Sequence, residues 1–485
     1  MKVLFATPEF APLVKTGGLG DVSAALPRAL RALGHDVRVL MPAYGGMASL
    51  GTLQRVISLP AWEGWPAAQL LHTELPDGQV LWLLACPALY PSSGTPYGDP
   101  AAPDLHAQAL RFGFLSRVAA WLATADNTTG WHADVLHAND WPAGLAPLYL
   151  RQLRDAPGAP PAAKSVVTLH NLAFQGIFPM HMADMLQVAP IHRGIEGVEY
   201  WGQLSMLKAA LQFADAITTV SPTYAAEIQQ PALGAGLDGV LRVRAASLHG
   251  ILNGIDTGVW NPASDPLIAA NYDLTTLDRK AANTRALRAR TGLVPSTAPL
   301  FGFVGRLTTQ KGIDWILASA PRWLATGAQL VVLGRGDAAL EHALLDLAQT
   351  HPGSVHATLG FDETLAHLIE AGADCFLMPS RFEPCGLNQM YSMAYGTPPV
   401  VTPTGGLADT VEDVGGSLER GTGFVMETTS QEGFDAAMDR VLCAWRKPEL
   451  WKGIQLRGMA RDFGWVNAAR QYSAIYATLA ETATG

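Results

Sequence analysis

Short apolar segments alternate with amphipathic helical stretches along most of the chain, and this alternation limits the fold more than any other feature. The first half contains six such segments: KVLFAT (2–7), HDVRVLMP (35–42), VLWLLACP (80–87), DVLHAND (134–140), SVVTLHN (165–171) and AITTVSP (216–222). Strands that are apolar throughout and are joined by helices predict a parallel sheet covered on both faces. The sequence therefore predicts an α/β fold.

The alternation starts again near residue 300, with PLFGFVGRL (299–307), AQLVVLGRGD (328–337), VHATLGF (355–361), DCFLMPS (374–380) and TPPVVTPT (397–404). The 485 residues exceed one usual domain of roughly 100–200 residues. We predict two Rossmann-like doubly wound domains that face a central cleft, an N-terminal one over 1–254 and a C-terminal one over 255–455. A last helix within 456–485 is expected to pack back on the N-terminal domain.

Composition excludes several classes of function. The formal net charge is −9, from 33 basic and 42 acidic residues, and no basic run occurs, which argues against nucleic-acid binding. No apolar run approaches the ~20 residues that span a membrane. The four cysteines form no CxxC pair, which indicates a reducing, cytoplasmic compartment and neither a disulfide framework nor a zinc site.

A glycine-rich loop, KTGGLGDV, begins at Lys15, directly after the first strand. It lacks the spacing of a P-loop, and Ser23 takes the place of the third glycine of a dinucleotide-binding loop. Gly17 and Gly18 would let a ligand approach the backbone ahead of a helix N-terminus, where anions are favoured, and Lys15 adds a positive charge. A tight turn with a solvated lysine explains the loop equally well.

The second domain repeats this chemistry in TGGLADTVED, where Thr404 precedes Gly405 and Gly406 after a strand. Two such helix starts suit a ligand that is both anionic and polyhydroxylated. Asp21 and Asp409 lie in the first turns of the two helices, where capping or a dipole interaction is the alternative to ligand binding.

Three charged residues follow strands of the second domain. Arg306 and Lys311, in GRLTTQKG, place a guanidinium and an ammonium on one loop, where they could hold a diphosphate or form a solvated basic turn. Glu383, in PSRFEPCGLNQM, could accept hydrogen bonds from sugar hydroxyls or cap the next helix.

Eight motifs together resemble the bacterial glycogen synthase and plant starch synthase family: KTGGLGDV, HANDW, LHNLAFQG, TTVSPTYAAEI, GILNGID, GRLTTQKG, SRFEPCGLNQMYSMAYGT and TGGLADTV. The resemblance covers nearly the whole chain, in order. It implies a glycosyltransferase-B fold and transfer of glucose from ADP-glucose to the non-reducing end of an α-1,4-glucan, with retention at the anomeric carbon. It also implies that the reaction needs no metal and no cofactor.

The resemblance assigns donor binding to a first group of six residues. Lys15 matches the family's lysine near the glucose and the distal phosphate, and Gly17–Gly18 match its backbone-donor loop. Arg306 and Lys311 match the pair that holds the diphosphate. Glu383 matches the carboxylate that positions the glucose ring.

Further positions match the acceptor side and the reaction centre. Asp140 matches an acceptor-side acid, and His170 matches a histidine beside the transferred sugar, with Asn171 next to it. Asn253 matches an active-site asparagine and is assigned to donor binding, as are Thr404, Gly405 and Gly406. Cys385 matches a cysteine near the site, although a small buried cysteine more often serves packing.

Some positions depart from the family pattern. Asn388 stands where many relatives have threonine, so nucleotide contacts could change. Thr402 and Pro403 stand where some relatives carry arginine, which lowers the positive charge near the second loop. Tyr391 takes the place of a second glutamate found in other retaining members of the wider fold, as expected for the synthase branch.

The chemistry favours a front-face exchange, in which the departing phosphate oxygen helps to deprotonate the acceptor hydroxyl. A retaining hydrolase would need a second carboxylate as nucleophile, and none is evident on the other face of the sugar. Three alternatives remain: a glycogen phosphorylase with lysine-bound pyridoxal phosphate, a nucleotide-sugar epimerase, and a non-catalytic glucan-binding protein. The last would not need the diphosphate pair Arg306 and Lys311.

Overall fold

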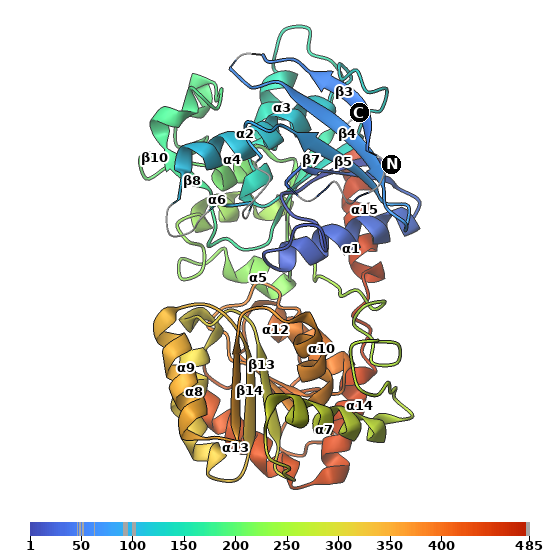
Figure 1. The fold of residues 1–485 in the computed structure, drawn as a ribbon. Coiled ribbons are helices and arrows are strands. Elements are labelled where there is room, and N and C mark those ends of the chain that lie inside the picture. The colour runs from blue at the N-terminus through green and yellow to red at the C-terminus, as the bar shows by residue number, and fades with distance from the viewer. Residues whose placement is uncertain are drawn as a thin grey trace. The chain divides into compact units, whose positions relative to one another are not determined.

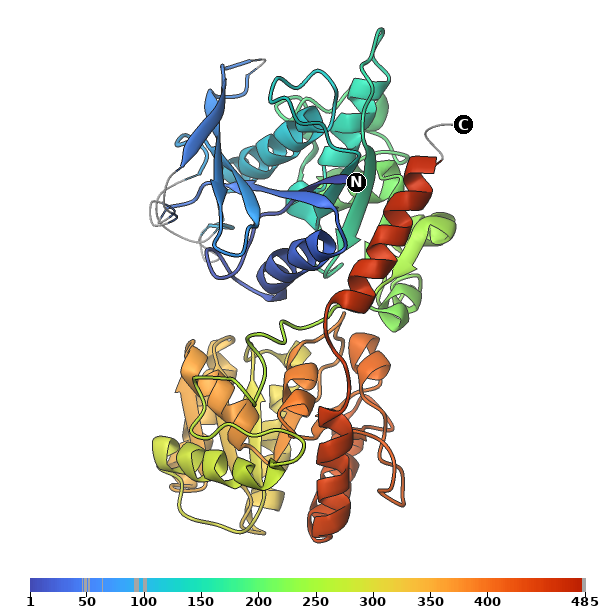
Figure 2. The ribbon, with the colours of Figure 1, turned by 90° about the vertical axis from the view of Figure 1, so that its right-hand side faces the viewer.

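The computed structural model describes residues 1–45, 47, 50, 53–62, 64–90, 96–98 and 103–481. Residues 482–485 of the predicted C-terminal segment lie outside this described part. The chain divides into two compact units (Figures 1 and 2): unit 1 comprises Met1–Asn253 and Trp465–Gly485, and unit 2 comprises Gly254–Gly464.

Unit 1 is built on a nine-stranded sheet. Its spatial order is β12 (Leu248–Gly250), β11 (Ala216–Thr219), β7 (Lys164–Leu169), β6 (Val135–Asn139), β1 (Lys2–Ala6), β2 (Asp36–Pro42), β5 (Val80–Ala85), β4 (Ala68–Glu74) and β3 (Gln54–Leu59). The strands from β12 to β5 run parallel, whereas β4 and β3 are antiparallel to their neighbours. The sheet is therefore mixed and not wholly parallel as the sequence suggested.

The central strand β1 shows why the parallel part was readable from the sequence. Val3, Leu4, Phe5 and Ala6 are fully buried, and β1 pairs with β2 on one side and β6 on the other. A strand covered on both faces carries apolar residues at every position.

Helices cover this sheet on both faces. They are α1 (Gly18–Ala32), α2 (Leu105–Leu122), α3 (Ala146–Arg154), α4 (Met206–Phe213), α5 (Pro222–Glu227), α6 (Asp238–Val243) and α15 (Val466–Glu481). The last helix, α15, packs against α1 (Figure 2). The hydroxyl of Tyr476 in α15 lies 2.7 Å from Nδ1 of His137 in β6, so the last helix is hydrogen-bonded to the middle of the sheet.

A small antiparallel sheet accompanies the large one in unit 1. It consists of β8 (Ile177–Pro179), β10 (Gln203–Ser205) and β9 (Glu199–Tyr200), in that order. β9 and β10 form a hairpin whose turn is Trp201–Gly202.

Unit 2 contains a six-stranded, wholly parallel sheet in the order β15 (Val355–Leu359), β14 (Gln329–Gly334), β13 (Leu300–Val304), β16 (Cys375–Met378), β17 (Pro399–Val401) and β18 (Phe424–Val425). Its helices are α7 (Lys280–Thr291), α8 (Ile313–Leu324), α9 (Ala338–Thr350), α10 (Glu363–Gly372), α11 (Asn388–Ala394), α12 (Gly405–Thr410), α13 (Gln431–Trp445) and α14 (Pro448–Met459). One apolar cluster of this unit includes Phe301, Trp323, Leu330 and Phe434, which join the sheet to α8 and α13.

Strand order places a topological switch point in each sheet. In unit 1 the chain moves outward from β1 through β2 and later returns to begin the other side with β6. In unit 2 the same reversal falls between β13 and β16. Ligands of doubly wound sheets bind beyond the carboxyl ends of the strands at such points, so the loops after these four strands are where a site is expected.

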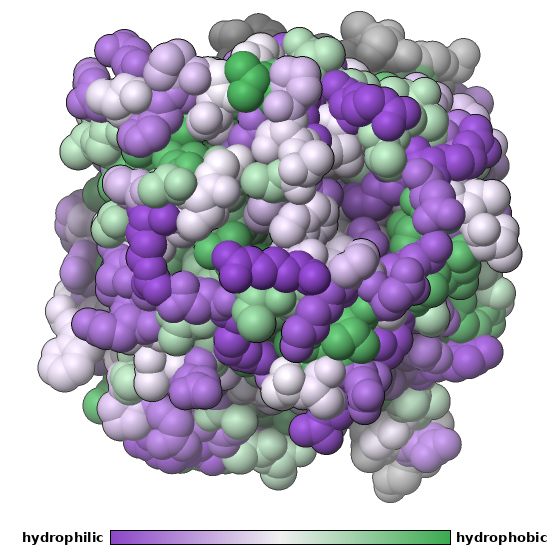
Figure 3. All heavy atoms as spheres, turned by 90° about the horizontal axis from the view of Figure 1, so that it is seen from below, coloured by the Kyte–Doolittle hydropathy of each residue, from purple (hydrophilic) through white to green (hydrophobic). Residues whose placement is uncertain are grey.

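On the face drawn in Figure 3, hydrophobic side chains lie among hydrophilic ones. Among the helices of the described residues, none combines the length and the hydropathy needed to cross a membrane.

Candidate active site

The switch point of unit 2 holds an ion pair between two of the predicted residues. Lys311 ends the 3₁₀ turn Thr309–Lys311 after β13, and its Nζ contacts Oε2 of Glu383, which lies beyond β16. Ser380 Oγ donates to the same carboxylate oxygen at 3.0 Å. Glu383 is only 7% exposed, and its Oε1 has no hydrogen-bond partner among the described residues. The site thus offers one carboxylate oxygen for a further donor.

Arg306 lies on the same loop but reaches solvent. Its Nη2 makes a long contact of 3.4 Å with Oε1 of Gln310, and the residue is exposed. Gln310 also joins the two loops, because its Nε2 donates to the carbonyl of Phe382 at 3.3 Å and its carbonyl accepts from the N–H of Arg381 at 2.7 Å. Gln310 was not among the predicted residues, although it lies within the GRLTTQKG motif.

The glycine pair after β17 packs against the segment that carries Glu383. Gly405 has φ +43°, and a Cβ there would lie 1.9 Å from the carbonyl oxygen of Glu383. A Cβ on Gly406 would lie 2.2 Å from the carbonyl oxygen of Cys385, and the Gly406 N–H faces the carbonyls of Glu383 and Pro384 at 3.3 and 3.2 Å. These glycines therefore let two loops of the chain approach each other, whether or not a ligand also approaches them.

Other predicted residues of unit 2 support these loops. Asn388 begins α11, and its Nδ2 donates to the carbonyl of Val304 at 2.7 Å, just before the Arg306 loop. Thr404 and Cys385 are 5% exposed. Tyr391, at the position of a second glutamate in other branches, stacks on Trp260 with ring centroids 3.9 Å apart.

The switch point of unit 1 gathers an acid and a histidine. The N–H of His170 donates to Oδ1 of Asp140 at 2.8 Å, and Nε2 of His170 lies 3.1 Å from Oδ1 of Asn139. Asp140 has φ 54°, a left-handed conformation that is uncommon outside glycine and is found at functional sites. The turn after β6 thus aims this carboxylate at the loop after β7.

Burial sets the protonation of these two groups. It raises the pKa of Asp140 to about 7, and the charge of Glu9 adds to this effect, while the N–H groups of His170 and Asn171 oppose it. Burial lowers the pKa of His170 to about 3, so the imidazole is neutral at neutral pH.

Glu9 is a site candidate that the sequence analysis missed. It follows β1 and is 2% exposed; its carboxylate accepts from the N–H of Thr16 at 2.7 Å and from the hydroxyl of Tyr97 at 2.6 Å. The carboxylate therefore fixes the loop that carries Lys15. An acid at the carboxyl end of the first strand was the available signal.

The glycine-rich loop of unit 1 is open. Lys15 Nζ pairs with Oδ1 of Asp21 at 2.9 Å, and both side chains are partly exposed. Gly17 precedes α1, and a Cβ there would meet no atom within 4 Å. Gly18, the first residue of α1, is also exposed. This loop has room for a ligand next to its backbone.

Two predicted asparagines differ in their surroundings. Asn171 Oδ1 accepts from the N–H of Ala173 at 3.0 Å, a local turn contact. Asn253, after β12, is 5% exposed, and its Oδ1 has no partner among the described residues. A buried carbonyl without a donor is the kind of group that a ligand can satisfy.

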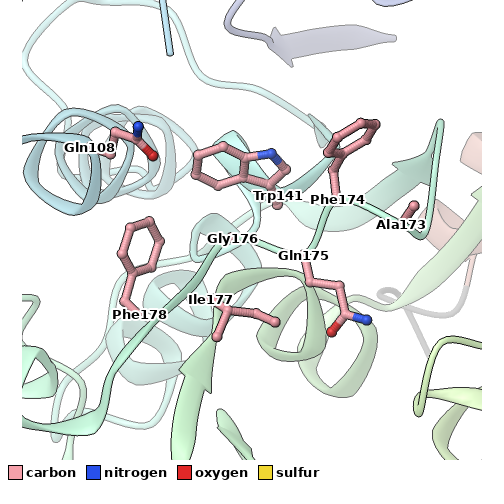
Figure 4. A pocket seen from close by; sticks show the side chains of 8 residues that line it. All are labelled: Gln108, Trp141, Ala173, Phe174, Gln175, Gly176, Ile177 and Phe178. Atoms are coloured by element: carbon pink, nitrogen blue, oxygen red, sulfur yellow. The ribbon is translucent and has the colours of Figure 1, made fainter. Parts of the chain in front are cut away.

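A cavity of about 250 Å³ lies in unit 1, next to the segments that follow β6 and β7 (Figure 4). Its walls are Gln108, Trp141, Ala173, Phe174, Gln175, Gly176, Ile177 and Phe178. Trp141 directly follows Asp140 in the chain. No group of three or more potential metal ligands occurs in the part of the chain that the structure describes.

Two family models match the chain. The starch synthase catalytic domain matches residues 2–243, and the glycosyl transferases group 1 domain matches residues 287–452. A glycogen synthase of Paracidovorax citrulli is 60% identical over 481 residues, which cover 98% of this chain and 94% of that protein. A glycogen synthase of Aromatoleum aromaticum is 50% identical and covers 99% of this chain and 97% of its own length. The chain belongs to the glycogen and starch synthase family.

Solved structures agree with this membership. The catalytic domain of starch synthase IV from Arabidopsis thaliana, bound to ADP and acarbose, has a TM-score of 0.85 and 30% identity, with 99% of both chains covered. Sucrose-phosphate synthase from Thermosynechococcus elongatus has a TM-score of 0.61 at 19% identity, covers 99% of this chain and 98% of its own, and shows the fold alone. This member of the glycogen and starch synthase family is a glycosyltransferase, and the predicted fold class is confirmed.

Proposed function

We propose that this enzyme transfers glucose from ADP-glucose to the non-reducing end of an α-1,4-glucan, with retention, and so elongates glycogen. The observation that carries the proposal is the arrangement of Arg306, Lys311 and Glu383 at the switch point of unit 2. It combines two cations for a diphosphate with one buried carboxylate for a sugar. The glycogen synthases and the ADP-bound starch synthase among the relatives support the choice of glucan and of adenine nucleotide.

The cations serve the leaving group. Negative charge grows on the diphosphate as its bond to the sugar breaks, and fixed cations stabilise that charge. The exposed guanidinium of Arg306 can bind phosphate oxygens in a bidentate manner. Lys311 supplies an ammonium next to the sugar-binding carboxylate, and Lys15 is proposed to add a third positive charge.

The carboxylate positions the sugar. Oε1 of Glu383 has no partner among the described residues, so it can accept a hydrogen bond from a glucose hydroxyl, while Oε2 is held by Lys311 and Ser380. Because this residue contacts sugar and not nucleotide, Glu383→Ala is expected to lower kcat strongly while ADP still binds. Binding calorimetry with ADP and initial rates measure the two effects separately.

The acceptor is assigned to unit 1. Asp140, once ionised, accepts a hydrogen bond from another hydroxyl of the acceptor sugar and so orients the attacking one, and the backbone N–H of His170, whose imidazole is neutral, holds the same acid. The bond between the anomeric carbon and the phosphate oxygen breaks as the bond to the acceptor oxygen forms on the same face. The departing phosphate oxygen takes the acceptor's proton, so no protein nucleophile is required.

A transfer assay tests the proposal. ADP-glucose and UDP-glucose are each supplied with and without glycogen, and we expect rapid incorporation of glucose only with ADP-glucose and glycogen. The new linkages should be hydrolysed by an α-1,4-specific amylase. Conversion of the donor without an acceptor would instead indicate an epimerase, and phosphate-dependent release of glucose 1-phosphate with pyridoxal absorbance would indicate a phosphorylase. We also propose that the reaction takes place in the cytoplasm.

A further inference from the structure

An exposed tryptophan stands at the tip of the β9–β10 hairpin in unit 1. Trp201 is 78% exposed, whereas Trp65, Trp82 and Trp323 belong to the fully buried core. Its φ is 50°, a region that bulky residues rarely adopt and that usually persists for a functional reason. Neither the packing of the core nor the reaction steps above explain why this large ring is held in solvent.

The ring is held in place along its edge. Gly236 has φ +76°, and a Cβ there would lie 3.3 Å from Nε1 of Trp201 and 2.8 Å from the hydroxyl oxygen of Tyr200. That tyrosine donates to the carbonyl of Ala235 at 2.7 Å. The Ala235–Gly236 loop therefore packs against the hairpin tip and leaves most of the indole surface open.

A buried lysine fixes the other side of the hairpin. Lys208 in α4 is 5% exposed, and its ammonium donates to the carbonyls of Ile195 at 2.7 Å and Glu199 at 2.5 Å. The start of β9 is thus tied to the body of unit 1. An aromatic side chain that is already fixed before its ligand binds loses less conformational entropy on binding than a mobile one.

The hairpin tip is connected to the cavity that Trp141 lines. Gln175 Nε2 donates to the same Ala235 carbonyl at 2.9 Å, and Gln175 lines the cavity together with Trp141 and Phe174 (Figure 4). The Gln175 side chain is almost fully buried, and its Oε1 has no partner among the described residues. Phe174 is 51% exposed. The cavity wall and the hairpin tip are therefore joined through the carbonyl of Ala235.

We infer that Trp201 is an outer binding site for the acceptor glucan, on which a glucose unit several residues from the reacting end stacks. This inference rests on the proposed function. Pyranose rings present C–H faces that pack on aromatic rings, and neither face carries charge. A glucan chain fits better than a protein partner because the open indole is linked, through Ala235 and Gln175, to a cavity lined by Trp141, the residue after the proposed acceptor-side acid Asp140. Only chains long enough to leave the cavity would reach Trp201.

Acceptor-length kinetics on the full chain test this site. Initial rates are measured at saturating ADP-glucose with maltotriose, a series of longer maltodextrins and glycogen, for wild type, W201A, W201F and V243A. Val243 ends α6 and is 84% exposed, so V243A controls for loss of an exposed apolar side chain. We expect W201A to lower the ratio of kcat/KM for glycogen to that for maltotriose by about 5- to 30-fold, the cost of truncating an aromatic contact. W201F should restore most of this ratio, and V243A should not change it.

Two outcomes overturn the inference. Equal losses with every acceptor, or no loss with any, would show that Trp201 does not bind the distal chain. Retarded migration in glycogen-containing native gels, without donor, gives a second readout, and W201A should lose more retardation than V243A. If the wild-type chain elongates no glucan, the proposed function is itself wrong; if it does and W201A shows no length dependence, only the outer site is wrong.

Discussion

Removing the ammonium of Lys311 tests the core of the proposed donor site. The side chains of Lys311 and Glu383 are 18% and 9% exposed, so the pair is largely withdrawn from water. Lys311→Ala leaves the Glu383 carboxylate with the Ser380 hydroxyl as its one remaining side-chain donor among the described residues. The variant should therefore lose both stability and activity.

The two losses can be given magnitudes. A hydrogen bond to a charged group contributes roughly 1.5–3 kcal/mol, and the partial exposure of Lys311 places the loss in unfolding free energy at the lower end, about 1.5–2 kcal/mol. In catalysis the same range corresponds to about 10- to 150-fold in rate. Charge grows on the diphosphate only as the bond breaks, so kcat should fall as well as kcat/KM.

A double-mutant cycle separates the two effects. Urea unfolding and initial rates at saturating ADP-glucose are measured for K311A, E383Q and the double variant. The double variant should be less destabilised than the sum of the single variants, because no buried carboxylate is left unpaired. Additive destabilisation would refute the ion pair. A rise in KM alone would make Lys311 a donor anchor, and unchanged kinetics would leave the loop a solvated turn.

Three further predictions concern other parts of the molecule. Burial raises the pKa of Asp140 to about 7, and its ionised form is the proposed hydrogen-bond acceptor, so kcat/KM for glycogen should rise through about pH 7 in a pH–rate series, and D140N should lose this limb. Burial lowers the pKa of His137 to about 3, so on acidification this histidine is protonated in the unfolded chain before it is protonated in the folded protein. The unfolding free energy should therefore fall as the pH is lowered below about 6.5, by up to ~1.4 kcal/mol per pH unit. His170 changes the unfolding free energy with pH in the same direction, and Asp140 in the opposite direction. The contribution of His137 is therefore isolated by comparing H137N with wild type: the unfolding free energy from urea titrations should change less steeply with pH in the variant. Equal pH dependence in the two proteins would contradict the prediction. Gly405→Ala should lower both melting temperature and activity, since its Cβ would overlap the Glu383 carbonyl, whereas Gly17→Ala has open space and should keep the melting temperature but weaken ADP-glucose binding in calorimetry.

The strands were predictable because burial on both faces leaves a continuous apolar run. The apolar runs at β1, β7 and β14 were recognised as strands for this reason, and nearly every residue of these strands is buried. The antiparallel strands β3, at the edge of the sheet, and β4, next to it, were missed because they are partly exposed and their apolar pattern is broken. A turn signal was present at Asp77–Gly78, where Gly78 has φ +79° between β4 and β5.

The site could be predicted only in part. Loops after parallel strands are brought to one edge of a sheet by the fold, which is why Lys311 and Glu383 could be singled out on separate segments. Which side chains meet there depends on loop conformation, so Gln310 and Glu9 were not recognised. A glycine pair has the same appearance whether it admits a ligand or another loop, and the packing of Gly405 against Glu383 is of the second kind.

The position of α15 has a consequence for the order in which the enzyme is made. Unit 1 is completed by a helix that leaves the ribosome only after all of Gly254–Gly464, a delay of roughly 10–40 s at ~5–20 residues per second. Until then the surface of unit 1 that receives Tyr472 and Tyr476, both fully buried in the finished protein, has no cover. Unit 2, which is continuous in sequence, can fold first although it is synthesised second. Ribosome-bound chains halted just before Trp465 should therefore be cleaved by protease in unit 1 and protected in unit 2; equal protection of both units would show that α15 is dispensable for folding.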